Sequence, residues 1–263
     1  MSRPALSVDD LSVELTLDGR TREVVKGVSF SVEPGRILGV VGQTGSGKSV
    51  TLRAIMGLLP ANGRVTTGRV RLGDRDVLDL GPEELRRVRG RELSLIPQNP
   101  RGALQPLWTI HHHYKKLIRA HRKASRQEIW ELATSDLARL GLVDPERVLS
   151  SYPHELSGGI AQRVVLALSL ALGPSVVLAD EPTTALDMTV QREILDLITT
   201  LCGQDQLGLV IVTHDLGIVA NYCDDMLILH RGEVVEAGVP AEVLANPQAD
   251  YSRRLVAATG GAP

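Results

Sequence analysis

Aromatic residues are scarce in this sequence of 263 residues, which has one Phe, two Trp and four Tyr. Proteins that hold single-stranded nucleic acid stack its bases on such side chains. The charge is also nearly balanced, because 29 Lys and Arg stand against 31 Asp and Glu and leave a formal net charge of −2. Without a stacking surface or a basic field, the sequence predicts no nucleic-acid partner.

Cysteine is scarce as well, since only Cys202 and Cys223 occur. Two thiols are too few for a structural zinc site of four cysteines, or for an all-cysteine iron–sulfur site, within one chain. We interpret them as two ordinary buried or half-buried thiols in a reducing compartment, with one disulfide as the alternative.

Long apolar runs are missing too. The uncharged stretch of residues 164–179 is shorter than the ~20 residues that a membrane-spanning helix needs, and Gly173 and Pro174 divide it. It predicts a buried helix, a turn and a buried strand. Asp9 and Asp10 stand where an export signal needs apolar residues, so we expect no such signal. The sequence predicts a soluble protein that reaches a membrane only through partners.

Short apolar runs alternate with helical patterns along most of the chain. Residues 37–41, 93–96, 176–179, 209–212 and 226–229 are apolar runs, interrupted only by Ser94 in the second, and such runs are typical of strands buried on both faces. A helical pattern around residues 189–201 separates two of them, so we expect an α/β fold with a parallel sheet. Further segments are assigned by their patterns: strands at 11–17, 28–32 and 233–236, a helical insertion at about 108–140, and helices at 241–245 and 251–258.

A glycine-rich loop follows the first of these buried runs. Residues 42–49 read GQTGSGKS and fit the phosphate-loop pattern G-x-x-x-x-G-K-[ST]. A helical pattern follows at 48–59, so backbone amides of the loop converge on phosphate oxygens at a helix start. Lys48 is expected to reach the β- and γ-phosphates and Ser49 to bind Mg²⁺; the alternative is a plain flexible turn. The nucleotide-binding residues predicted here are Gly42, Gln43, Thr44, Gly45, Ser46, Gly47, Lys48, Ser49 and Val50.

A pair of carboxylates ends a later apolar run. Residues 176–181 read VVLADE, and such a strand delivers its last residues to the edge of the sheet where ligands gather in open α/β folds. We expect Asp180 to hold Mg²⁺ and Glu181 to polarise the attacking water. The alternative is a solvated acidic turn.

Together with residues 156–159, which read LSGG and precede Gln162 and Arg163, these motifs make the sequence resemble the ATP-binding subunit of ABC transporters over nearly its whole length. In that family the signature motif closes over the γ-phosphate held by the opposite protomer. The resemblance therefore assigns Ser157, Gly158 and Gly159 to the nucleotide site of a partner chain. A helix start suits this role because its free amides favour an anion.

Three further positions match the family in order and spacing. Gln98, after the run 93–96, resembles the Q-loop glutamine, which binds Mg²⁺ and links the site to the membrane partner. Asp187 in TALD (184–187) resembles the D-loop aspartate, and His214 in VTHD resembles the switch histidine on the γ-phosphate. A lone histidine after a strand is usually structural, but its order after Glu181 favours the functional interpretation. The resemblance implies catalytic roles for Lys48, Glu181 and His214, and Mg²⁺ ligation by Ser49, Gln98 and Asp180.

The segments around the motifs, such as QNPRGALQP and NPQADYSRRL, resemble those of the ATP-binding subunits that drive import of dipeptides, oligopeptides and nickel. The resemblance implies one ABC ATPase domain over 1–263: a P-loop NTPase core with a mostly parallel sheet and an antiparallel β subdomain (about 1–97 and 175–263), and a helical signature subdomain (about 98–174). It implies ATP and Mg²⁺ as cofactors, a second ATPase subunit, two transmembrane permease subunits and, indirectly, an extracytoplasmic solute-binding protein. The expected location is the cytoplasmic face of the cell membrane.

Two departures from the family pattern concern the nucleotide. The fifth signature position is Ile160, where the family often has Gln or Met. Members commonly stack adenine on an aromatic residue before the phosphate loop, but the one aromatic there is Phe30, whose alternating context marks it as a core residue. The sequence instead offers the aliphatic surface of Val24 or Val25.

Rival functions remain to be compared. ABC ATPases of DNA repair carry a long coiled coil between phosphate loop and signature, but only 107 residues separate Ser49 from Leu156 and they show no sustained heptads. Translation ATPases of this superfamily normally hold two cassettes in one chain, whereas this sequence contains the motifs of one. A silent regulatory subunit is disfavoured by the complete set of catalytic residues. The solute and the choice between self-pairing and a related partner are not encoded, although the resembled group favours two different chains.

Three consecutive histidines, His111, His112 and His113, invite a metal interpretation. Consecutive residues on a helix point in different directions, so the sequence favours a surface histidine run.

Overall fold

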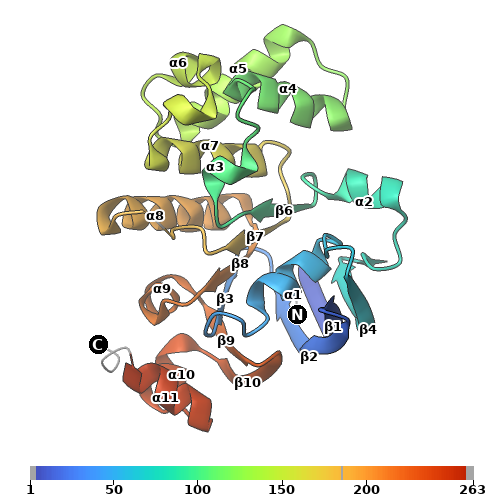
Figure 1. The fold of residues 1–263 in the computed structure, drawn as a ribbon. Coiled ribbons are helices and arrows are strands. Elements are labelled where there is room, and N and C mark those ends of the chain that lie inside the picture. The colour runs from blue at the N-terminus through green and yellow to red at the C-terminus, as the bar shows by residue number, and fades with distance from the viewer. Residues whose placement is uncertain (1–3, 185, 259–263) are drawn as a thin grey trace.

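The computed structural model describes residues 4–184 and 186–258, in which a six-stranded sheet, a four-stranded sheet and a group of helices are packed together (Figure 1). The order of the larger sheet is β10-β9-β3-β8-β7-β6. All neighbours in it are parallel except the pair β9–β10. Its strands are β3 (Ile37–Val41), β6 (Leu93–Ile96), β7 (Val176–Asp180), β8 (Gly208–Thr213), β9 (Asp225–His230) and β10 (Glu233–Gly238).

Four of the five apolar runs form the inner strands β9, β3, β8 and β7 of this sheet, and the run 93–96 forms the edge strand β6. Every residue of β3, β7 and β8 is buried, as expected. Because side chains alternate along a strand, each run supplies two hydrophobic cores. Val177 and Ile211 face the core that holds α7 (Gly158–Leu170) and α8 (Met188–Asp205). Leu178 and Val210 face the opposite core, with α1 (Lys48–Ile55) and the four-stranded sheet. The α/β prediction with a mostly parallel sheet is confirmed.

The smaller sheet is antiparallel, in the order β2-β1-β4-β5. Its strands are β1 (Leu6–Leu17), β2 (Arg20–Val32), β4 (Gly63–Leu72) and β5 (Arg75–Asp76). The strands β1 and β2 are longer than predicted, because a two-residue turn joins them directly. This turn has positive φ at Asp18 and Gly19, and an Asp-Gly pair favours it. The strand β4 was not predicted, because its residues are mostly polar and are exposed or half-buried.

The predicted helical insertion is confirmed between β6 and β7. It contains α3 (Pro100–Ala103), α4 (Ile110–His121), α5 (Arg126–Arg139), α6 (Pro145–Ser150) and α7. Fully buried side chains recur at helical spacing in α4, at Ile110, Tyr114 and Ile118, which explains the pattern. Figure 1 shows α4, α5 and α6 at one end of the molecule and α10 and α11 at the other.

The uncharged stretch forms the end of α7, a turn with Gly173 in the left-handed region, and β7. Among the described residues, no helix is long and apolar enough to cross a membrane.

The two cysteines are free thiols, with Cys202 buried and Cys223 half-buried. The remaining α-helices in the described part of the chain are α2 (Pro82–Val88), α9 (Leu216–Tyr222), α10 (Pro240–Ala245) and α11 (Asp250–Ala258).

The histidine run is not a plain surface feature, which corrects the prediction. The three rings are half-buried. His111 packs against Trp130, and His113 packs against Trp108. The Nε2 atom of His113 accepts from the Gln105 amide at 2.8 Å. These ring contacts show that the histidines pack at the start of α4. Within the described ranges, no group of three His, Cys, Asp or Glu residues is arranged to hold a metal ion.

Candidate nucleotide site

The loop of residues 42–49 joins β3 to α1 and is confined closely by its neighbours. A Cβ atom on Gly42 would lie 2.2 Å from the Leu229 carbonyl oxygen, and one on Gly47 would lie 2.7 Å from that of Val24. Gly47 also has a φ of 107°, which favours glycine. No described side chain caps α1, so the amides of its first turn are available to an anion.

Lys48 lies inside this loop and is 6% exposed. Its Nζ donates to the carbonyl oxygens of Gly42 at 2.6 Å and Gln43 at 3.1 Å. Burial lowers the pKa of Lys48, and the carboxylates of Glu181 and Asp180 oppose that shift. An ammonium group held in this way, beside open amides, is suited to bind phosphate oxygens.

Ser49 and Asp180 form the part of the site that fits Mg²⁺. Ser49 Oγ donates to Asp180 Oδ1 at 2.8 Å, and Asp180 is the last residue of β7, 8% exposed. Burial raises the pKa of Asp180, while the bond from Ser49 lowers it. A hydroxyl and a carboxylate are hard oxygen donors, and Mg²⁺ is usually held by one or two carboxylates together with substrate phosphates. The donor set therefore fits this ion.

Glu181 connects three separate segments of the chain. Its Oε2 accepts from Gln98 Nε2 at 3.1 Å and from Thr184 Oγ1 at 2.8 Å, and its Oε1 lies 3.3 Å from His214 Nδ1. Its φ of 46° is a left-handed conformation, a strain that is concentrated at functional sites. Burial raises the pKa of Glu181, but the hydrogen bonds from Thr184 and His214 outweigh burial and the net shift is downward. The carboxylate is therefore ionised at neutral pH and able to accept a proton.

These groups surround one hollow of about 300 Å³. It contains the reactive groups predicted from four distant motifs, and its lining residues are Thr44, Gly45, Gly47, Lys48, Ser49, Val50, Gln98, Glu181 and His214. Sequence reasoning missed the contribution of Thr184, whose hydroxyl orients Glu181. Its position three residues after Glu181 was the only available signal.

The signature residues lie elsewhere. Ser157 caps α7 by accepting from the Ile160 amide at 3.4 Å, and both Ser157 and Gly158 are exposed. Ser157 and Gly159 line a different hollow, of about 430 Å³, formed with residues of α6, of α8 and of the loop before α6. No described residue lines both hollows. Ile160 packs against the core of the helical group.

Asp187 also has a local role in the single chain, since it caps α8 by accepting from the amides of Thr189 and Val190. Ala185, in the middle of the predicted D-loop, lies outside the described residues. The adenine surface needs a correction at one of its two residues: Val25 is fully buried and offers no surface, whereas Val24 is half-buried. Phe30 packs against a core, as predicted.

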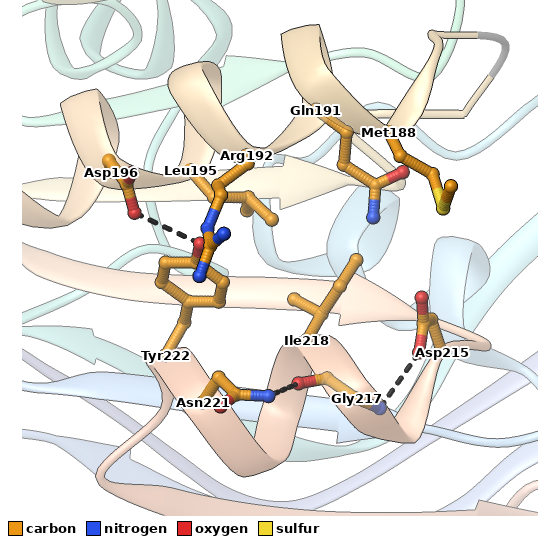
Figure 2. Close-up of a pocket in the computed structure, with 10 residues that line it drawn as sticks. All are labelled: Met188, Gln191, Arg192, Leu195, Asp196, Asp215, Gly217, Ile218, Asn221 and Tyr222. Carbon is orange, nitrogen blue, oxygen red and sulfur yellow. Dashed lines mark hydrogen bonds between the residues drawn. The ribbon is translucent and has the colours of Figure 1, made fainter.

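A larger groove, of about 640 Å³, lies between α8 and α9 (Figure 2). It begins at Met188, next to Asp187, and at Asp215, next to His214. At its far end Tyr222 Oη donates to Asp196 Oδ1 at 2.9 Å. It holds none of the groups of the phosphate-loop hollow, so the side chains predicted to react line the smaller hollow and not the larger one.

Comparison with known proteins agrees with this geometry. Residues 25–184 match the family model described as ABC transporter. The chain is 38% identical over 252 residues to the dipeptide transport ATP-binding protein DppD of Bacillus subtilis, covering 95% of this chain and 75% of DppD. The chain belongs to the ABC transporter family. The fold described above is therefore an ABC cassette fold, with its phosphate loop after β3.

Other relatives of this ABC protein are longer. It is 41% identical to the peptidoglycan transport ATP-binding protein YejF of Agrobacterium fabrum, covering 98% of this chain and 47% of YejF. It is 39% identical to the glutathione import ATP-binding protein GsiA of Escherichia coli K12, covering 96% of this chain and 42% of GsiA. The chain thus spans about half the length of these two relatives.

Solved ABC structures share the fold. The cassette MJ0796, solved as a dimer in a post-hydrolysis state bound to ADP and Pi, superposes with a TM-score of 0.79 at 29% identity, covering 89% of this chain and 98% of that one. The protein cbiO1 of Clostridium perfringens, part of the ABC transporter complex cbiONQ, gives a TM-score of 0.76 at 25% identity, covering 97% and 95%.

Proposed function

We propose that this chain is the ATP-binding and ATP-hydrolysing subunit of an ABC importer, which takes up a peptide or a related small solute through a membrane permease. The observation that supports this most directly is the single hollow in which Lys48, Glu181 and His214 meet. The relatives named above are described as dipeptide, glutathione and peptidoglycan transport proteins. Their names favour peptide-type solutes over nickel.

In this proposal the chain's own groups bind the triphosphate and activate water. The amides at the start of α1 and the ammonium of Lys48 bind the phosphates, and Ser49, Asp180 and Gln98 hold Mg²⁺, which neutralises charge on the phosphate oxygens when bound. Glu181 accepts a hydrogen bond from the attacking water and orients it. His214, next to Glu181, contacts the γ-phosphate.

The signature acts in a partner chain. Ser157 and Gly158 are exposed and lie outside the phosphate-loop hollow of their own chain, so a head-to-tail pair places them on the partner's nucleotide. The MJ0796 relative was solved as a dimer. ATP binds the closed pair better than the open one, and only that difference moves the equilibrium. The partner is a second ATPase subunit, either this chain or a related one.

The segment after Gln98 transmits this closure to the permease. Gln98 contacts Glu181 directly, and the residues that follow it lead into α3 and α4, with Leu107 81% exposed. We propose that residues 98–119 receive a short helix from the membrane permease. The subunit then lies on the cytoplasmic face of the cell membrane, and an extracytoplasmic solute-binding protein selects the solute.

Replacing His214 tests the catalytic role of the switch histidine. His214→Ala is expected to lower steady-state phosphate release by about 100-fold or more, within the range of a catalytic proton-handling or positioning group. The His214 side chain is 62% exposed, so its loss should leave the thermal midpoint unchanged. His121→Ala is a matched control, since His121 is the last residue of α4 and does not line the hollow. Equal losses of stability in both variants, without a catalytic defect in the first, would make His214 structural.

Copurification tests the transport assignment itself. The tagged chain, expressed in its native cell, is expected to bring down membrane permease subunits and to hydrolyse MgATP in that complex. Recovery of DNA or ribosomes in place of permease subunits would favour the non-transport class of ABC ATPase and contradict the proposal.

A further inference from the structure

The C-terminal helix α11 reaches the phosphate loop through one side chain. Figure 1 shows α10 and α11 packed beside β9 and β10, on the side of the molecule opposite the helical group. Tyr251, in the first turn of α11, is 7% exposed and belongs to the hydrophobic core that these elements share with β3. The Gln43 backbone amide donates to Tyr251 Oη at 3.1 Å, across 208 residues of sequence.

The Tyr251 ring is held firmly in this position. It stacks on the ring of His230 at a centroid distance of 3.8 Å and an interplanar angle of 22°. The start of α11 is tied to β10, because Glu236 accepts from the amides of Gln248 at 2.8 Å and Ala249 at 3.1 Å. The hydroxyl therefore reaches the loop from a fixed platform.

The bond from Gln43 acts on Lys48 through a single peptide unit. The N–H of Gln43 and the C=O of Gly42 belong to the same planar group. Its N–H end donates to Tyr251 Oη, and its C=O end accepts from Lys48 Nζ at 2.6 Å. Because the group is rigid, fixing one end fixes the direction of the other, and linked hydrogen bonds polarise each other.

We propose that Tyr251 is a positioning residue of the nucleotide site. Its hydroxyl fixes the peptide unit between Gly42 and Gln43, and thereby the phosphate loop and the position of Lys48, so that the C-terminal helix sets the affinity for MgATP. This inference rests on the proposed ATP-binding function. Within the described part of the chain, no hydrogen bond or ring contact joins Tyr251 to Gln98, Glu181 or His214, so it acts on binding and not on the activation of water.

The test is Tyr251→Phe, which removes one oxygen and keeps the ring that packs on His230. One lost hydrogen bond predicts an increase of about 3- to 10-fold in Kd and KM for MgATP, with kcat within about 2-fold of the wild-type value. The matched control is Tyr222→Phe, which loses a hydrogen bond to Asp196 in the groove between α8 and α9 (Figure 2). It should leave both Kd and KM unchanged.

Calorimetry measures the binding of MgATP to the purified chain, and thermal unfolding measures its stability. ATP hydrolysis is measured in the complete complex. A wild-type Kd and KM in Tyr251→Phe overturns the inference. So does a lower thermal midpoint with an unchanged KM, because that result assigns Tyr251 to packing alone. If the wild-type chain itself does not bind MgATP, the proposed function fails, and this inference fails with it.

Discussion

Glu181→Gln is expected to lower steady-state ATP hydrolysis by about 100- to 10,000-fold, the range that a general base contributes, while MgATP binding is retained. The amide keeps the shape of the carboxylate and is able to accept from Thr184, so the local structure persists. It cannot take a proton from water. The pKa of Glu181 lies below its ordinary value because hydrogen bonds from Thr184 and His214 outweigh burial, and the substitution therefore removes an ionised base.

The measurement is phosphate release at saturating MgATP, together with nucleotide binding by the same preparation. Glu233→Gln is the matched control, because Glu233 is exposed and pairs with Lys26 on the outer strands. Turnover within a few-fold of the wild-type value in Glu181→Gln would remove Glu181 as the base. Loss of binding and turnover together would assign it to the structure of the loop.

The second large effect is expected at Lys48. Lys48→Ala removes an ammonium that lies 6% exposed among loop carbonyls and lines the phosphate-loop hollow. Charge-assisted hydrogen bonds of about 1.5–3 kcal/mol are then lost, so the affinity for MgATP should fall by about 10- to 100-fold, with hydrolysis below detection.

Binding of MgATP by titration calorimetry checks this result, and Lys123→Ala is the control, since Lys123 is exposed between α4 and α5. An unchanged affinity in Lys48→Ala would contradict the assignment of the phosphate loop. If Lys48→Ala lowers both the thermal midpoint and the affinity for MgATP, the loss of binding would follow from loss of structure, and Lys48 would hold the loop together without binding nucleotide.

The sequence predicted local features well where one contiguous segment carries all the information. The phosphate loop is such a feature, because its glycines, lysine and serine fit a pattern that the chain satisfies within eight residues. Buried central strands are another, since a strand covered on both faces must be apolar throughout. Exposed strands carry no such signature, and β4, with Thr66, Thr67 and Gly68 in its middle, was missed.

The convergence of Gln98, Glu181 and His214 was predicted through family resemblance and the parallel sheet, because parallel strands end at the same edge. The contacts that hold these side chains in place were not predicted. The bond from Thr184 to Glu181 depends on a left-handed backbone at Glu181, which no pattern of residue types specifies. The burial of Val25 was also misjudged, because it is decided by the elements that pack against β2.

The order of motifs in the chain thus determined the class of fold and the reactive groups, since each motif is set by neighbours in the sequence. The tertiary structure alone decided how those groups are held. Tyr251 and Gln43 are 208 positions apart, and their contact exists because α11 packs against β10 beside the loop. Packing between distant segments depends on the whole hydrophobic core, and no local pattern records it.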